Sequence, residues 1–555
     1  MSDGVGRVFG IDLGTTYSAI AFVDDSGRPS VCRNTNNSET TPSVVHFESA
    51  SNVVVGETAK QSSFIDADNV VSLIKRKMGQ DETYSYHGED YTPESISALI
   101  LKALAADAAN YADGQVEKVV ITVPAYFGGR EKKATENAGV IAGLDVVGIV
   151  PEPVAAAVHY DLMSGGGEKT VLVFDLGGGT FDTTVIRVEA DEIRVICTDG
   201  ATNLGGADWD ARLRDHVLER FVAQAAPDES PEDDQEFMQE VALKVEDLKK
   251  QLSQQESRSV QLRFDGKAAK IEVTRAEFER MTADLLDSAI EILKRTLVTL
   301  EEKSSGAKID EVLLVGGSTK MPAVAARLVK DYGWAPKLHD PDLAVAKGAA
   351  IWGLSRVVYR MQDEVRQKVI ETGGSAAQAE QAADEVADKV ARDHGMSEEE
   401  FRPLVQKRTI SVLPHAFGAK LQDSSNPDRD YIKHLAFAND PLPTGDRTLT
   451  AYTVVDNQTS VEILIYEQEG TVLSEELEHN KELNHEGNRL IEGIPPKPKG
   501  QPLDISMSID EDGLLQLHAQ ERNTGKLLTI SVTVGMSPED VAAAKQTGAK
   551  ISVSS

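Results

Sequence analysis

Val171-Leu-Val-Phe-Asp175-Leu-Gly-Gly-Gly-Thr180-Phe-Asp182-Thr-Thr-Val-Ile186 is the stretch that decides the fold of this chain. Its apolar residues favour strands on either side of the glycines, and three consecutive glycines let the backbone turn tightly and approach a ligand closely. Free N–H groups in such a turn form a nest that binds anions, above all phosphate. Asp175 and Asp182 would repel a bare phosphate, so a cation such as Mg²⁺ fits between them. Alone, the stretch could equally be an ordinary glycine-rich hairpin.

A second stretch of the same design lies near the start of the chain, at Val8-Phe-Gly-Ile-Asp12-Leu-Gly-Thr-Thr-Tyr-Ser-Ala-Ile-Ala-Phe-Val23. It again reads as a strand, an Asp-Leu-Gly turn, threonines and a strand. Asp12 and Asp175 are too far apart in the chain for the short period of a solenoid. The repetition instead indicates two duplicated lobes that face each other across a cleft, each with one phosphate-binding hairpin.

A third glycine turn follows a predicted strand, at Val312-Leu-Leu-Val-Gly-Gly-Ser-Thr-Lys-Met-Pro322. Backbone N–H groups at the start of a helix bind anions, so this turn is compatible with a phosphate or a nucleoside. Predicted strands and helices alternate up to residue 355, which indicates an α/β fold.

Two groups of charged residues each have two interpretations. One group has the spacing of a single helix face and consists of Glu246, Lys249, Lys250 and Ser253. Such a stripe is usually exposed to solvent, but it could border a nucleoside. The basic run Lys75–Lys77 is either a solvated helix face or the source of a cation that meets a transferring phosphoryl group.

Composition and charge exclude several classes of function. The 555-residue chain has 57 basic and 90 acidic residues and a net charge of −33, so a broad basic surface for nucleic acid is not expected. Residues 1–4 lack the features of a signal peptide, and no apolar run approaches the ~20 residues that span a bilayer. Cys32 and Cys197 are expected to be buried thiols in a reducing compartment. We therefore expect a cytoplasmic protein that binds neither nucleic acid nor membrane.

The sequence pattern changes twice after the α/β region. Residues 357–408 are rich in Ala, Glu, Asp and Lys, and they predict two or three amphipathic helices without a strand, as an insertion or connector. Residues 409–535 contain short alternating strands, for example Leu503–Ile509 and Leu528–Val534, and predict an all-β sandwich. A short helix and a polar tail are expected after that. The expected divisions are 1–356, 357–408, 409–535 and 536–555.

Several of these motifs resemble those of the seventy-kilodalton heat-shock chaperones of the DnaK type. They are Ile11-Asp-Leu-Gly-Thr-Thr-Tyr-Ser18, Ile121-Thr-Val-Pro-Ala-Tyr-Phe127, Phe174-Asp-Leu-Gly-Gly-Gly-Thr-Phe-Asp182, Val315-Gly-Gly-Ser-Thr-Lys-Met-Pro322, Asp456-Asn-Gln-Thr-Ser-Val461 and Gly493-Ile-Pro-Pro-Lys-Pro-Lys-Gly500. The resemblance implies an actin-like (ribonuclease H-like) two-lobed ATPase domain that binds ATP or ADP with Mg²⁺, followed by a peptide-binding β-sandwich. It also implies unfolded or extended polypeptide clients, a J-domain co-chaperone and a nucleotide exchange factor as partners.

The resemblance also implies roles for single residues. Asp12 and Asp175 would hold Mg²⁺ through water, because Mg²⁺ gives up its waters reluctantly. Lys75 would contact the transferring phosphate, and Glu152 and Asp182 would orient the attacking water or the metal shell. The catalytic set is then Lys75, Glu152, Asp175, Thr180 and Asp182. The nucleotide contacts are Gly14, Thr15, Thr16, Tyr17, Gly177, Gly178, Gly179, Gly205, Gly206, Glu246, Lys249, Lys250, Ser253, Gly316, Gly317, Ser318, Lys320 and Asp342.

The chain departs from the family pattern at several positions. Lys250 and Lys320 stand where the family usually has arginine, and lysine lacks the planar guanidinium that stacks on adenine, so we expect weaker adenine binding. Lys132 replaces an arginine linked to interdomain signalling. The interdomain linker reads Thr409–Pro414, and because the chain stops at Ser555 we expect no helical lid.

Three functions are compatible with these features. The first is an ATP-dependent chaperone, in which Val461 and Ile463 are either walls of a peptide groove or ordinary sandwich core. The alternative is a chaperone-like scaffold that uses ATP as a switch and binds one specific protein partner. The third is an actin-fold kinase for a small molecule, which would leave the sandwich without a role.

Overall fold

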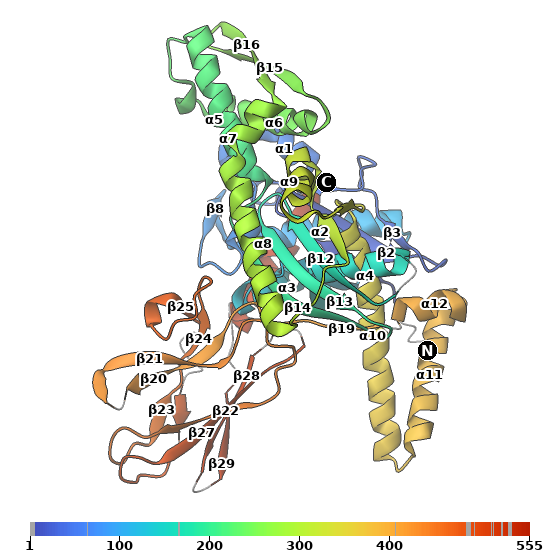
Figure 1. Cartoon of the computed structure of the whole chain (residues 1–555), viewed down its shortest axis with the longest axis vertical. Helices are drawn as coiled ribbons and strands as arrows, with labels where there is room; N and C mark the ends of the chain where they lie inside the picture. Colours follow the sequence, from blue (N-terminus) through green and yellow to red (C-terminus); the bar gives the residue numbers. More distant parts are fainter. Residues whose placement is uncertain are drawn as a thin grey trace.

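The computed structural model describes residues 6–63, 65–164, 167–405, 407–423, 425–483, 490–492, 494–511, 513, 515–522, 525–530 and 536–555. Their elements form two α/β lobes, a helical hairpin and a pair of packed β-sheets that we call the sandwich. In Figure 1 the hairpin and the sandwich project from the same end of the lobes.

The first lobe is built on a sheet with the strand order β11-β10-β1-β2-β3. Strands β1, β10 and β11 are parallel, and β2 runs antiparallel to both β1 and β3. Because Asp12 is the last residue of β1, the sheet delivers it to the edge where the first glycine turn begins. The strands are β1 (Val8–Asp12), β2 (Tyr17–Val23), β3 (Pro29–Val31), β10 (Lys118–Val123) and β11 (Asp145–Pro151).

The second lobe repeats this arrangement with the order β18-β17-β12-β13-β14. Strand β12 takes the place of β1, β13 runs antiparallel to it, and β17 lies parallel on its other side. The sequence shows the repeat in two hairpins, and the structure extends it to the two sheets as a whole. The strands are β12 (Lys169–Leu176), β13 (Phe181–Val188), β14 (Glu192–Ala201), β17 (Glu311–Val315) and β18 (Lys337–Leu338).

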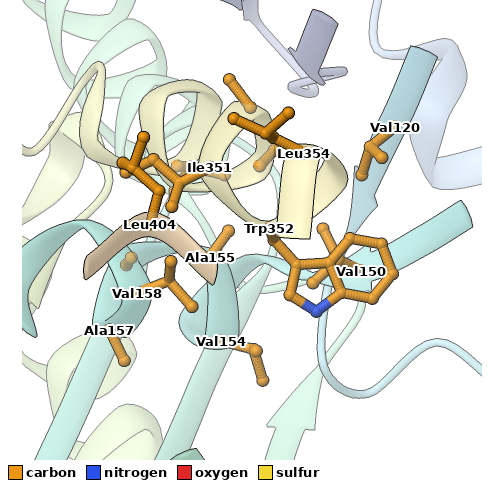
Figure 2. Close-up of a cluster of buried hydrophobic side chains, with 14 of the residues drawn as sticks. Val120, Val150, Val154, Ala155, Ala157, Val158, Ile351, Trp352, Leu354 and Leu404 are labelled. Carbon is orange, nitrogen blue, oxygen red and sulfur yellow. The ribbon is translucent and has the colours of Figure 1, made fainter. Parts of the chain in front are cut away.

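Helix α10 (Ala344–Glu371) packs against β1, β2 and helix α4 (Glu152–Ser164). Gly348 of α10 lies so close to the Ala155 carbonyl that a Cβ there would be 1.7 Å from its oxygen. Figure 2 shows the buried cluster around this contact, in which Trp352 of α10 and Val120 of β10 share one core. The small residues of α4 and α10 thus allow the two helices to pack closely between the lobes.

The predicted helical insertion consists of the end of α10 and two further helices, α11 (Ala376–Asp393) and α12 (Glu398–Val405). Phe401 and Leu404 of α12 bury their side chains in the core cluster of the lobes. A strand that the sequence did not predict follows at β19 (Arg408–Ile410), which pairs in parallel with the edge strand β14. The expected boundary between residues 408 and 409 falls inside this strand.

Further helices and strands flank the two sheets. Those of the first lobe are β4 (Thr41–Pro42), β5 (Val45–Ser49), β6 (Asn52–Val55), α1 (Glu57–Ser62), β7 (Val70–Val71), α2 (Pro93–Tyr111) and α3 (Gly129–Ile141). Those of the second lobe are α5 (Gly206–Ala225), α6 (Gln235–Gln254), β15 (Ser257–Phe264), β16 (Lys267–Thr274), α7 (Arg275–Met281), α8 (Ala283–Lys303) and α9 (Pro322–Tyr332).

The sandwich consists of two four-stranded sheets with the orders β21-β20-β24-β25 and β22-β27-β28-β29. Their inner faces share one hydrophobic core, in which Ile463 is 3% exposed and Val461 is partly buried. Val532, Val534 and the expected boundary at residue 535 lie outside the described residues. The strands of the two sheets are β20 (Phe417–Asp423), β21 (Asn426–Ala436), β22 (Arg447–Tyr452), β24 (Ile465–Gln468), β25 (Asn480–Glu482), β27 (Pro502–Ile509), β28 (Leu515–Glu521) and β29 (Lys526–Ile530). A separate two-stranded sheet consists of β23 (Ser460–Glu462) and β26 (Leu490–Glu492).

The segment after the sandwich returns to the first lobe, as the position of the C-terminal end in Figure 1 shows. Helix α13 (Pro538–Ala549) packs on α2 and α3. The expected polar tail is instead a strand, β30 (Ser552–Ser554), which pairs in parallel with β6. Ile551 is buried in the core of the first lobe, and Lys102 of α2 donates hydrogen bonds to the carbonyls of Gly548 and Ile551.

Cys32 and Cys197 are buried free thiols, as the sequence predicts. Over the described ranges, no helix has both the length and the apolar character that a membrane span requires.

Candidate functional site

A cavity of about 970 Å³ opens between the two lobes and is lined by all three glycine turns. Most of the residues predicted from the sequence line it, namely Asp12, Gly14, Thr15, Thr16, Tyr17, Lys75, Glu152, Asp175, Gly177, Gly178, Thr180, Gly206, Glu246, Lys249, Lys250, Ser253, Gly316, Gly317, Ser318, Lys320 and Asp342. Of the predicted catalytic and nucleotide-binding residues, Gly179, Asp182 and Gly205 are not among those that line this cavity.

The first two hairpins contact each other at the base of this cleft. A Cβ on Gly178 would lie 2.2 Å from the Thr16 side chain, and a Cβ on Gly179 would lie 2.3 Å from that of Thr15. A Cβ on Gly205 would meet the Gly179 amide nitrogen at 2.5 Å. The glycines are therefore required by the close approach of the two hairpins, one from each lobe.

Buried carboxylates gather beside these loops. Burial, reinforced by the charge of Glu152, raises the pKa of Asp182 to about 8 and that of Asp175 well above its usual range. Burial and the same glutamate raise the pKa of Asp12 to about 7. Each shift means that the ionised carboxylate lacks compensating positive charge, which a divalent cation would supply.

The chemistry of these donors fits a magnesium ion that the protein reaches through water. Within the described part of the chain, no three acidic, histidine or cysteine side chains converge closely enough to hold a metal by themselves. Mg²⁺ at nucleotide sites typically takes one or two carboxylates and completes its shell with water and phosphate oxygens. Asp12 and Asp175, at corresponding positions of the two lobes, are suited to that task.

The basic run Lys75–Lys77 is not a solvated helix face. Lys75 is buried, and its ammonium lies 2.5 Å from Glu152 Oε1. Arg76 reaches from the first lobe to the second, where it donates to the Gly179 carbonyl at 3.0 and 2.8 Å and to Asp208 Oδ2 at 2.6 Å. Sequence reasoning missed Arg76, because its partners lie more than a hundred residues away along the chain.

The helix stripe on α6 faces the cleft, and its charges are paired across it. The Tyr17 hydroxyl donates to Glu246 Oε1 at 3.0 Å, and Lys60 Nζ donates to Glu246 Oε2 at 2.5 Å. Lys250 lies 2.6 Å from Glu246 Oε1. Burial would raise the pKa of Glu246, but Lys60 and Lys250 outweigh it and hold this pKa at about 2. Lys60, on α1 of the first lobe, is a second residue that sequence reasoning missed.

Lys249 turns away from the other members of the stripe. Its ammonium donates to the Gly206 carbonyl at 2.9 Å and to Asp210 Oδ2 at 2.6 Å. Lys249 therefore fixes the start of α5 beside the second hairpin.

The third glycine turn joins the second hairpin to the far end of the cleft. Gly316 has φ 81°, and a Cβ there would lie 2.4 Å from the Leu176 carbonyl oxygen. The Ser318 hydroxyl donates to the Gly177 carbonyl at 2.9 Å. Lys320 forms an ion pair with Asp342, so both residues lie together at the rim of the cavity.

The sequence was compared with families and with characterised proteins. A family model described as Hsp70 protein matches residues 8–85, 82–371 and 426–550, so α11 and α12 fall between its matches. The chaperone protein DnaK of Thermotoga petrophila is 34% identical over 535 residues, which cover 95% of this chain and 80% of the relative. The chaperone protein DnaK of Thermosipho melanesiensis is 32% identical over 541 residues, which cover 96% of this chain and 81% of the relative.

Proposed function

The chain belongs to the Hsp70 family, and on this basis we propose that it is an ATP-dependent molecular chaperone. It would hydrolyse Mg-ATP and couple hydrolysis to the binding and release of unfolded polypeptide segments. The observation that carries the proposal is the contact of two glycine–threonine phosphate loops, one from each lobe, at the base of the 970 Å³ cleft.

The proposal includes the fold and the domains. Residues 1–356 would be an actin-like (ribonuclease H-like) ATPase domain, which the matching strand orders of the two lobes support. Residues 409–535 would bind peptides, residues 357–408 would be an insertion, and residues 536–555 would be a separate C-terminal segment.

In the proposed site, the chain holds the phosphates with backbone amides and hydroxyls of the two hairpins. The loops that contain Gly14–Tyr17 and Gly177–Thr180 would enclose the phosphate chain from both lobes. Asp12 and Asp175 would orient the waters of a bound Mg²⁺, which would neutralise charge that develops on the phosphate oxygens.

Hydrolysis in this proposal depends on three buried side chains behind the phosphates. Lys75 would place fixed positive charge on the transferring phosphoryl group, and Glu152 keeps the lysine in position. Asp182 Oδ1 accepts a hydrogen bond from the Tyr126 amide at 3.0 Å, whereas its buried Oδ2 has no partner among the described residues. That oxygen would orient the attacking water.

With Lys250 and Lys320 in place of arginines, the site would bind the adenosine part of the nucleotide less tightly than an arginine-containing site would. Lys250 and Lys320 are each paired with a carboxylate of the cleft, Glu246 and Asp342. We therefore propose that they hold the walls of the pocket and do not stack on the base.

Lys75→Ala tests the hydrolytic assignment. We expect turnover to fall about a hundredfold or more while nucleotide binding is retained, because Lys75 acts on charge that develops in the transition state. Turnover by malachite-green phosphate release and affinity for a fluorescent ATP analogue give the two quantities. Lys77→Ala is the matched control, since Lys77 is half exposed and forms a local ion pair with Glu82. Full turnover in Lys75→Ala would contradict the assignment.

Peptide binding separates this function from the two alternatives. We expect fluorescent hydrophobic heptapeptides to bind more weakly with ATP than with ADP, and Val461→Asp to weaken that binding. Absence of peptide binding in both nucleotide states would favour a scaffold for one specific partner, and a phosphorylated small-molecule product would favour a kinase.

A J-domain co-chaperone, a nucleotide exchange factor and a cytoplasmic location belong to the same proposal.

A further inference from the structure

We propose that Leu73 and Arg76 act together as positioning residues for Lys75. The strained backbone of Leu73 sets the direction of the short 3₁₀ helix η2 (Ile74–Lys77), and Arg76 holds this helix against the second lobe. The inference rests on the proposed ATP hydrolysis, in which Lys75 acts on the transferring phosphoryl group. It adds that Lys75 keeps its position only while the second lobe is in contact with Arg76.

The backbone of Leu73 lies in the left-handed region, with φ 58° and ψ 20°. This conformation brings the Cβ of an L-residue close to the following carbonyl oxygen, so glycine, asparagine and aspartate are the residues that usually adopt it. Among the described non-glycine residues with positive φ, only Leu73 and Ala226 have apolar side chains. A leucine in this region indicates strain that neighbouring contacts must hold in place.

The strained residue lies directly between a strand of the first lobe and the catalytic lysine. Strand β7 (Val70–Val71) ends two residues before Leu73, and η2 begins at the next residue. The Leu73 carbonyl accepts a hydrogen bond from the Arg76 amide at 3.0 Å, which closes the first turn of η2. The direction in which η2 leaves the strand, and with it the position of Lys75, therefore depends on the φ and ψ of Leu73.

Arg76 holds η2 in this direction through contacts with the other lobe. Its guanidinium donates to the Gly179 carbonyl from Nε at 3.0 Å and from Nη2 at 2.8 Å. Nη2 also donates to Asp208 Oδ2 at 2.6 Å. Asp208 Oδ2 is itself fixed at the start of α5, because it accepts a hydrogen bond from the Gly205 amide at 2.8 Å. Both partners of Arg76 belong to the second lobe, so these contacts exist only while the lobes are together.

Loss of the Arg76 contacts would allow Leu73 to relax. An unrestrained leucine favours negative φ, and rotation to negative φ would turn η2 away from its present direction. Lys75 would then move away from the phosphoryl group. A displacement of ~1 Å can slow a reaction by as much as about a hundredfold, so a small relaxation is sufficient to lower kcat. The strain at Leu73 thus opposes the position of Lys75, and Arg76 overcomes it.

A rescue experiment on the full chain tests the inference through steady-state ATPase kinetics. We expect Arg76→Ala to lower kcat about tenfold, because Lys75 is withdrawn. In the double variant Arg76→Ala/Leu73→Asn, we expect kcat to return to within about threefold of the wild type, because asparagine adopts the left-handed region with little strain. The Leu73 side chain is half-buried and lines the open cavity, so asparagine removes little packing.

Two matched controls separate relief of strain at Leu73 from other effects. Leu73→Ala removes the same side chain but leaves the strain, so Arg76→Ala/Leu73→Ala should remain as slow as Arg76→Ala. Ala226→Asn relieves the strain of another left-handed residue, with φ 43° at the end of α5, and should give no rescue. Rescue by either control, or no rescue by Leu73→Asn, would overturn the inference. If Arg76→Ala does not fold, Arg76→Lys allows the same comparison, because lysine keeps the charge but lacks the fork.

Hydrogen exchange of residues 72–77, measured by mass spectrometry without nucleotide, separates this inference from the proposed function. We expect faster exchange in Arg76→Ala than in the wild type. Exchange should return towards the wild-type rate in Arg76→Ala/Leu73→Asn but not in Arg76→Ala/Leu73→Ala. This pattern would support the inference even if no protein hydrolyses ATP, in which case the proposed function fails. Wild-type exchange in Arg76→Ala, or equal exchange in the two double variants, would overturn the inference.

Discussion

At the scale of single residues, the closest contact between the first two glycine hairpins involves Gly178. A methyl group on this residue would overlap the Thr16 side chain, so the two hairpins would have to separate. We expect Gly178→Ala to weaken ATP binding about tenfold or more, which corresponds to ~1.4 kcal/mol. Titration with a fluorescent nucleotide measures the loss. Gly114→Ala is a suitable control, because a Cβ there would contact only the Ala112 carbonyl, at 3.9 Å; equal affinity of the two variants would argue against the loop contact.

Also at this scale, the residues that sequence reasoning predicted differ in kind from those it missed. Thr16, Gly178 and Asp175 belong to short local motifs whose chemistry depends on near neighbours in the chain. Lys60 and Arg76 gain their carboxylate partners, Glu246 and Asp208, only when the lobes close around the cleft. A single lysine or arginine has no local pattern that reveals a partner in the other lobe, so these contacts needed the structure.

At the scale of elements, α12 is anchored to the lobes by side chains of its own. Leu404 is 4% exposed and belongs to the same core cluster as Trp352 of α10 (Figure 2). We expect Leu404→Ala to reduce the free energy of unfolding by about 2–5 kcal/mol, as for other large-to-small core substitutions. Urea denaturation followed by circular dichroism gives this value. Ile370→Ala, at a position 58% exposed on α10, should change the free energy of unfolding little. Similar losses of unfolding free energy in the two variants would contradict the anchoring of α12.

Two elements that the sequence did not predict, β19 and β30, are short edge strands. Arg408–Ile410 and Ser552–Ser554 have three residues each, and their sequences lack a distinctive alternating pattern. Such strands are stable only because a partner strand is already in place, and local propensity is a weak guide to them. Helix α6 was easier to predict, because its charged stripe repeats with the period of a helix over several turns.

At the scale of the whole molecule, the sandwich is attached to the lobes at both of its ends. One attachment runs through β19 on the second lobe, and the other leads to α13 and β30 on the first lobe. Glu467 of the sandwich also accepts a hydrogen bond from the Gly129 amide of the first lobe, at 3.2 Å. We expect Glu467→Ala alone to change the radius of gyration little in small-angle X-ray scattering. Addition of Ile551→Asp should increase the radius, because burial of Ile551 holds the second attachment. Addition of Val298→Asp, at a position 60% exposed on α8, should leave the radius unchanged. If the two double variants had the same radius of gyration, that result would contradict the second attachment.

The pairing of β30 with β6 also determines when the first lobe can be completed during synthesis. Strand β6 is made early, but its edge partner is made only after both lobes, the helical hairpin and the sandwich. A domain that folds as it leaves the ribosome would therefore present this edge unpaired until residues 552–554 emerge. The order in which the chain is synthesised thus leaves one edge of the first lobe open to incorrect strand partners for most of translation.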